Sequence, residues 1–77
     1  MFLKNAEAGN FYTVTGIWLG KKAARRLETL GMTKGTEILV IKKKASGSMV
    51  IKIRGTRFAL GAGFTQGISV GGNEDGR

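Results

Sequence analysis

Seventy-seven residues without cysteine or histidine make one small domain that has no disulfide, no zinc finger and none of the usual thiol or imidazole catalysts. Thirteen Lys and Arg against five Asp and Glu give a formal charge of +8, which favours acidic partners such as nucleic acid, anionic lipid or an acidic protein surface. The longest aliphatic run is far shorter than the roughly 20 residues of a membrane helix, so we expect a cytoplasmic protein without direct membrane insertion.

The first part of the chain predicts one long strand with a local irregularity. Residues 2–4 offer at most a short edge strand before a turn. Aromatic and β-branched residues dominate residues 11–18, which predicts a strand with Tyr12 and Val14 on one face. An interior glycine weakens a strand without packing against anything, so Gly16 indicates a bulge or bend at this point.

The pattern of residues 21–30 predicts a basic amphipathic helix. At 100° per residue, one arc of roughly 120° carries its apolar side chains, Ala23, Ala24, Leu27 and Leu30. The opposite side, which we call the cationic helix face, consists of Lys21, Lys22, Arg25 and Arg26. Gly31 stands where a left-handed residue ends a helix, and Met32 is placed to fold back onto the last turn.

The remainder of the chain predicts four more strands. A tight turn over residues 33–36 precedes a strand over residues 37–42, whose aliphatic side chains occupy both faces, so we expect it in the centre of the sheet. Three further strands follow over residues 49–53, 56–60 and 67–70. One helical turn is expected within residues 61–66, and residues 71–77 predict a disordered polar tail.

Five or so short strands with one helix between the first two imply a mainly β protein, a small and strongly bent β-barrel over residues 1–70. The apolar positions of the strands and the helix predict its core. We expect the core residues to be Tyr12, Val14, Ile17, Leu27, Leu30, Ile38, Val40, Ile51, Ile53, Phe58, Leu60, Ile68 and Val70.

Neither of two glycine patterns fits a nucleotide-binding loop. The segment from Gly16 to Lys22 lies between a strand and a helix, but it is one residue too short between its glycines and lacks the Ser or Thr that would hold magnesium. Residues 61–67 have neither the dinucleotide spacing nor a full helix after them. The carboxylates are scattered along the chain, so we expect no catalytic residue, no cofactor and no metal site.

The cationic helix face departs from the pattern of a helix optimised only for stability. Two of its residues lie in the first turn, where the helix dipole disfavours cations, and its members form two like-charge pairs at i, i+4 spacing. Each pair costs roughly a few tenths of a kcal/mol. We therefore predict a partner-binding surface, with Trp18 and Leu19 as its hydrophobic anchor. A plain solvated face and a buried Trp18 are the alternatives.

Residues 25–38 resemble the signature of the FeoA (ferrous iron transport protein A) family, a basic helix ending in Leu-Gly-Met-Thr that is followed by Gly-Thr and an apolar strand. Gly16-Ile17 and residues 53–60, with their Arg-Gly hairpin, extend the resemblance over nearly the whole expected barrel. Two features depart from the family pattern. Lys34 stands where proline is frequent, and residues 61–66 replace a charged helical turn.

The resemblance implies an SH3-like β-barrel that acts without catalysis as an adaptor or regulator of FeoB, a bacterial membrane transporter of ferrous iron with a cytosolic G-domain. The predicted partner is the cytosolic part of that transporter. Similar barrels also form the C-terminal domains of iron-dependent repressors. Because the chain has no imidazole, no thiolate and no clustered carboxylates, we do not expect it to hold ferrous iron tightly by itself.

A basic small barrel that binds nucleic acid is the alternative function. Its phosphate-tracking patch would consist of Lys42, Lys43, Lys44, Lys52, Arg54 and Arg57. Single-strand binders rely on aromatic stacking platforms, and this chain has six aromatic residues, several of them expected in the core. That shortage weakens the alternative without removing it.

Overall fold

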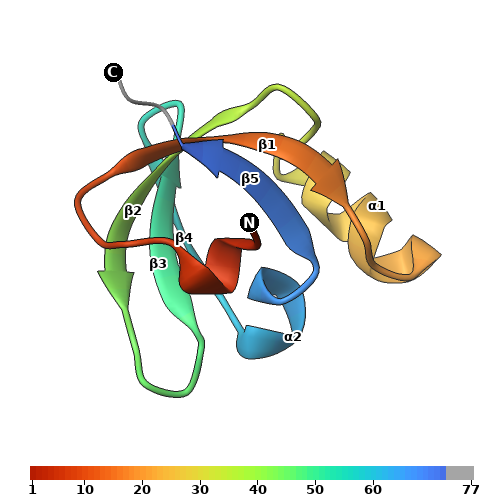
Figure 1. The fold of residues 1–77 in the computed structure, drawn as a ribbon. Helices are drawn as coiled ribbons and strands as arrows, with labels where there is room; N and C mark the ends of the chain where they lie inside the picture. The colour runs from red at the N-terminus through yellow and green to blue at the C-terminus, as the bar shows by residue number, and fades with distance from the viewer. Residues whose placement is uncertain (73–77) are drawn as a thin grey trace.

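The structure is a computed structural model that describes residues 1–72. Five antiparallel strands form one sheet in the order β4-β3-β2-β1-β5, and a helix joins β1 to β2 (Figure 1). The elements are η1 (Leu3–Asn5), β1 (Phe11–Ile17), α1 (Lys21–Thr29), β2 (Glu37–Lys43), β3 (Met49–Ile53), β4 (Thr56–Leu60), α2 (Ala62–Thr65) and β5 (Ile68–Gly72). The expected mainly β architecture, with α1 between the first two strands, is confirmed.

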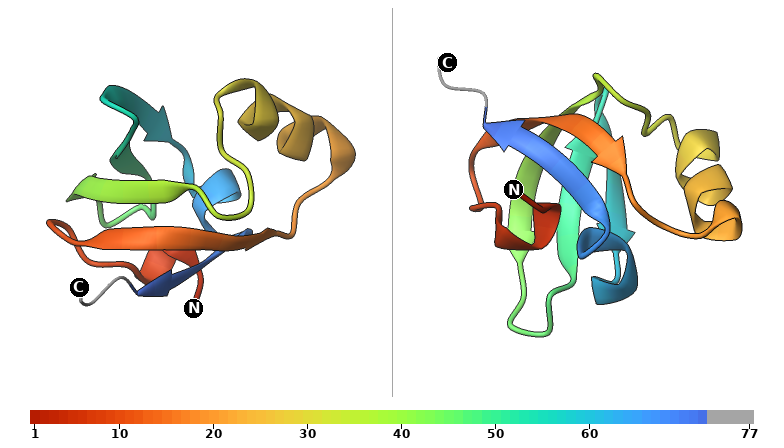
Figure 2. Two further views of the ribbon diagram at one scale, coloured as in Figure 1. Left: turned by 90° about the horizontal axis from the view of Figure 1, so that it is seen from above. Right: turned by 45° about the vertical axis from the view of Figure 1, so that its right-hand side comes forward.

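Strand β2 occupies the centre of the sheet, as its aliphatic side chains on both faces predict. It pairs with β1 through Tyr12 and Ile38 and with β3 through Val40 and Ile51, and all four side chains are buried. The sheet bends strongly, so that β1 and β5 cross in front of β2, β3 and β4 (Figures 1 and 2). The apolar faces of the two halves thereby enclose the core.

The N-terminal segment differs from the edge strand expected over residues 2–4. Only Phe2 makes a β-bridge, to Ser69 of β5, and the next three residues form the 3-10 helix η1. Both Leu3 and Ala6 are fully buried. Residues three apart point to opposite faces of a strand but to the same side of a 3-10 helix, so burying both apolar side chains requires the helical backbone.

Two register shifts bend the sheet, one between β1 and β5 at Gly16 and one between β2 and β3 after Val40. The first confirms the predicted bulge. Strand β5 continues through Gly71 and Gly72, which pair with β1, so these two glycines belong to the sheet and not to a tail. The rest of the expected disordered tail, residues 73–77, lies outside the described residues.

A Schellman motif ends α1 at the predicted position. Gly31 has a φ of +89°, and its N–H donates to the Glu28 carbonyl oxygen at 2.9 Å. The Met32 N–H donates to the Leu27 carbonyl oxygen at 2.9 Å, and the Met32 side chain is fully buried. The following turn places Gly35 at a φ of +95°, which also suits only a glycine well. The expected helix stop and tight turn are therefore confirmed.

The core agrees with the expected core at most positions. Its buried apolar residues are Leu3, Ala6, Tyr12, Val14, Leu27, Met32, Ile38, Val40, Met49, Ile51, Ile53, Leu60, Ile68 and Val70. Three expected members, Ile17, Leu30 and Phe58, are only partly buried and pack against the core from its margin. They lie at the end of β1, at the end of α1 and on the edge strand β4, where neighbouring elements cover one side only.

Candidate functional site

Helix α1 lies beside the barrel beyond the end of β1, with Leu27 as its buried residue (Figure 1). It begins after Gly20 without a side-chain cap and carries no acid in its first turn. All four residues of the cationic helix face are exposed, and no ion pair joins them to another side chain within residues 1–72. The unfavourable clustering of charge that the sequence predicts is therefore not relieved within the described part of the chain.

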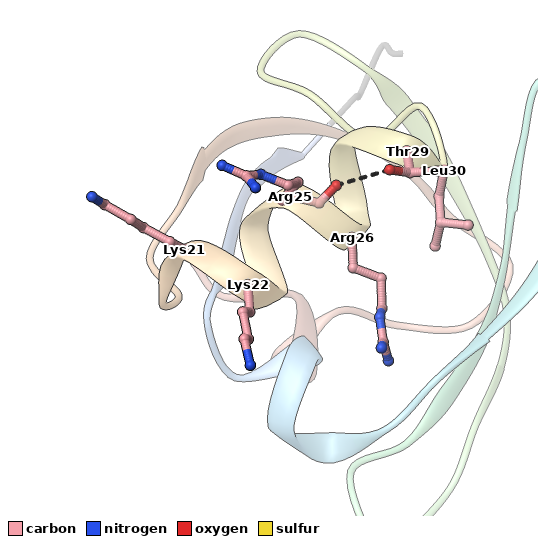
Figure 3. A pocket seen from close by; sticks show the side chains of 6 residues that line it. All are labelled: Lys21, Lys22, Arg25, Arg26, Thr29 and Leu30. Atoms are coloured by element: carbon pink, nitrogen blue, oxygen red, sulfur yellow. Dashed lines mark hydrogen bonds between the residues drawn. The ribbon is translucent and has the colours of Figure 1, made fainter.

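The cationic side chains border an open groove of about 720 Å³ on α1, together with Thr29 and Leu30 (Figure 3). Its lining forms two rows at i, i+4 spacing, one of Lys21, Arg25 and Thr29 and one of Lys22, Arg26 and Leu30. The Thr29 hydroxyl donates to the Arg25 carbonyl oxygen at 3.1 Å, which directs it back onto the helix. A groove with cations along both sides suits a negatively charged occupant.

Trp18 lies on the surface and is 71% exposed, so the alternative of a buried Trp18 is wrong. Its Nε1–H donates to the Ser69 hydroxyl at 3.0 Å, and the Thr15 hydroxyl donates to the same oxygen at 2.9 Å. The Ser69 hydroxyl in turn donates to the Gly16 carbonyl oxygen at 3.2 Å. The indole is therefore exposed but held in one orientation by strands β1 and β5.

Gly16 makes this position of the indole possible. A Cβ at Gly16 would lie 3.0 Å from Trp18 Nε1 and 3.0 Å from Ser69 Oγ, closer than such contacts normally allow. The missing side chain thus leaves the space that the edge of the indole occupies. The sequence predicts a bulge or bend at Gly16 but no packing of Trp18 against it, and it gives no role to Ser69, because the pairing of β1 with β5 cannot be read from local pattern.

Leu19 packs against the barrel, whereas the Trp18 side chain is exposed. It is half-buried beside the core, and a Cβ at Gly67 would lie 2.7 Å from Leu19 Cγ. The Trp18 N–H donates to the Gly67 carbonyl oxygen at 2.7 Å. Leu19 therefore fixes the connection between β1 and α1, while Trp18 presents the larger apolar surface to solvent.

The second basic set is spread over the outer side of the barrel. Lys52 pairs with Leu39 on β2 and with Arg57 on β4, and Leu39 also pairs with Phe11 on β1, so these four residues form one cross-strand row. Phe11 is 48% exposed in this row. The remaining lysines, Lys42, Lys43 and Lys44, lie at the end of β2, whereas Arg54 lies in the β3–β4 turn.

Residues 1–72 contain no group of three or more His, Cys, Asp or Glu placed to hold a metal ion. None of the helices in the same part is long and apolar enough to cross a membrane.

The fold and the site define a small β-barrel protein with a basic surface helix between its first two strands. A model of the FeoA domain family matches residues 1–71, so the chain belongs to the FeoA family. No curated protein sequence matches it.

Solved structures of FeoA proteins have the same fold. The iron uptake regulatory protein FeoA is 30% identical over 91% of this chain and 93% of that chain, with a TM-score of 0.84. FeoA from Stenotrophomonas maltophilia, solved with zinc and described as a prokaryotic SH3 domain protein, is 28% identical over 92% of this chain and 89% of that chain, with a TM-score of 0.79. The expected SH3-like barrel is thereby confirmed.

A manganese-dependent transcriptional repressor contains the same barrel as part of a longer chain. It is 20% identical over 94% of this chain but only 41% of that chain, with a TM-score of 0.86. At this identity the likeness concerns the fold alone.

Proposed function

We propose that this chain is a non-enzymatic accessory of bacterial ferrous iron uptake that works on the cytoplasmic side of the membrane. It docks the cationic helix face, with Trp18 beside it, on the cytosolic part of a FeoB-type transporter. Membership of the FeoA family supports the link to ferrous iron, and the Stenotrophomonas maltophilia relative is itself described as a candidate activating factor of ferrous iron transport. The observation that carries the choice of surface is Trp18, which is exposed and hydrogen-bonded next to four exposed cations.

Physical chemistry supports a protein partner at this surface. Tryptophan and arginine are the side chains most enriched at the energetic centres of protein interfaces. An indole that is already fixed by Ser69 loses little side-chain entropy on binding. The exposed cations attract acidic surfaces over a Debye length of about 10 Å at 0.1 M salt, which accelerates encounter with a negatively charged domain.

The test is a pull-down of the transporter's cytosolic domain with a charge-reversed helix. The triple variant Lys22→Glu, Arg25→Glu and Arg26→Glu should abolish binding, because it inverts the field of the groove. The matched control, Lys42→Glu, Lys43→Glu and Lys44→Glu, changes the net charge by the same amount on another surface and should keep binding. All six side chains are exposed, so both variants should stay folded and unfold in one cooperative thermal transition. Binding retained by the helix variant would exclude this face.

The cross-strand row of Phe11, Leu39, Lys52 and Arg57 supports nucleic-acid binding as the second candidate function. It combines an exposed aromatic ring with two cations on neighbouring strands. A mobility-shift assay at physiological salt separates the two functions. Sub-micromolar binding to single-stranded DNA or RNA that is lost on Arg57→Glu, and kept by the helix variant, would favour this candidate.

A further inference from the structure

Two of the exposed large apolar side chains lie on one face of the molecule. Among residues 1–72 these exposed side chains are Met1, Phe2, Phe11 and Trp18. Phe2 is bridged to Ser69 through the backbone, and Trp18 is hydrogen-bonded to Ser69 through its side chain. Both aromatic residues therefore neighbour the same serine, although they are distant from it in sequence.

The strand register places the two rings on the same side. Gly16, Ser69 and Phe2 form a row across β1, β5 and the N-terminal segment. Directly paired residues of antiparallel strands point to the same face of a sheet, so Phe2 shares the outward face of the Ser69 hydroxyl. The strand neighbours of Ser69, Ile68 and Val70, are buried and point inward, as alternation requires. The indole, lying over Gly16, is on this outward face as well.

Phe2 and Trp18 form an aromatic pair, and Trp18 lies close to the start of the cationic helix face. Lys21 and Lys22 begin α1 three and four residues after Trp18, beyond the end of β1 (Figure 2). The indole N–H is already bonded to Ser69, so the ring presents mainly apolar surface. The surface therefore has two adjoining zones, one aromatic and one cationic.

We propose that the aromatic pair and the cationic helix face together adsorb on the surface of membranes that contain anionic phospholipids. Trp and Phe partition to the boundary between headgroups and acyl chains, and Lys and Arg are attracted by anionic headgroups. Adjoining apolar and cationic zones fit that layered surface, whereas a single-stranded nucleic acid needs rings and cations interleaved along a groove. The net charge of +8 acts in the same direction.

Adsorption of this kind differs from insertion across the bilayer, and it goes beyond the proposed docking on a transporter. It would hold the chain at the membrane surface with or without a protein partner. The transporter pull-down contains no lipid, so the two experiments can succeed or fail independently.

Trp18 provides the measurement, because it is the chain's single tryptophan and its fluorescence reports directly on its own environment. Mixed vesicles of phosphatidylcholine and phosphatidylglycerol should shift its emission to the blue. With vesicles of phosphatidylcholine alone, the same shift should require a lipid concentration at least about ten times higher. Added salt should reverse the shift, since exposed charges are screened. Sedimentation with the vesicles gives an independent measure of binding.

Substitutions can show whether vesicle binding uses the aromatic pair and the cationic helix face. Phe2→Ser should weaken vesicle binding about tenfold, as expected for one aromatic side chain withdrawn from the interface, whereas Phe11→Ser, which removes an exposed phenylalanine from another strand position, should not. The charge-reversed helix should weaken binding by about tenfold or more, and the matched reversal at Lys42, Lys43 and Lys44 by much less. The helix variant changes only exposed side chains, so it tests the proposal even if Phe2→Ser loosens the N-terminal segment.

Four results would overturn the proposal. The first is an emission spectrum that neither vesicle changes, and the second is equal binding to neutral and anionic vesicles. The third is full binding by the charge-reversed helix or by Phe2→Ser. The fourth is a single-stranded oligonucleotide that shifts Trp18 emission at lower concentration than the anionic vesicles do, which would assign the surface to nucleic acid.

Discussion

Gly31→Val should destabilise the protein by about 1–2 kcal/mol, because Gly31 has a φ of +89°. A left-handed backbone costs a non-glycine residue roughly 1–3 kcal/mol, and a β-branched residue lies toward the upper end of that range. Reduced freedom of the unfolded chain returns about 0.4–1 kcal/mol of this. No atom lies within 4 Å of the position of a Cβ, so the cost comes from the backbone and not from a collision. Relaxing the backbone instead would break the two hydrogen bonds that cap α1 and move the buried Met32.

Thermal and urea unfolding measure this loss. For a domain of this size, each kcal/mol lowers the melting temperature by about 4–8 °C, so we expect a fall of about 5–15 °C. The control is Gly63→Ala in α2, where φ is not positive and no atom lies within 4 Å of the Cβ position. That variant should be neutral or more stable, since alanine suits a helix better than glycine does. An unchanged midpoint for Gly31→Val would refute the argument.

Three further predictions follow from the site and the core. Anaerobic titration calorimetry with Fe²⁺ should show no micromolar stoichiometric binding, because the chain has no His or Cys; such binding would revive a metal chaperone or sensor role. Gly67→Val should destabilise by about 1–3 kcal/mol and change Trp18 fluorescence, because its side chain collides with Leu19; an unchanged spectrum would contradict the packing. Met32→Ala should cost about 2–4 kcal/mol in urea unfolding, and a loss below about 1 kcal/mol would show that Met32 does not fill the core.

The regular elements could be predicted from the sequence because their signals are local. The helix has a 3.6-residue apolar pattern and a glycine stop, and the strands alternate between turn residues. The Arg54-Gly55 turn is a clear case, since both residues have positive φ as a type I′ hairpin turn requires. Each of these signals lies within a few residues of the structure that it specifies.

The N-terminal segment and the surroundings of Trp18 could not be predicted, because they depend on contacts between distant parts of the chain. The bridge from Phe2 to Ser69 joins the two ends of the chain, and without it residues 2–4 look like any short edge strand. The exposure of Trp18 depends on Ser69 in the same way. A three-residue helix such as η1 is also too short to leave a periodic pattern.

Removing positive charge from the cationic helix face should have opposite effects on stability and on binding, and one variant can separate the two. Lys22→Glu replaces a repulsive pair with Arg26 by an attractive pair at i, i+4, with the acid on the favoured N-terminal side. It also places an acid in the first turn of α1, where the helix dipole favours negative charge. Together these changes should stabilise the protein by about 0.5–1.5 kcal/mol and raise its melting temperature by about 3–8 °C.

If the face serves only to contact solvent, Lys22→Glu should increase the stability of the fold and leave binding unchanged. If the face serves binding, Lys22→Glu should weaken association with the transporter domain while the fold becomes more stable, the trade-off expected where a site conflicts with local stability. The matched control is Lys42→Glu on strand β2, where neither the helix dipole nor an i, i+4 pair is affected. It should leave both the stability and the affinity for the transporter domain nearly unchanged. A more stable Lys22→Glu variant with full affinity for the transporter domain would show that the unfavourable charges on α1 have no role in docking.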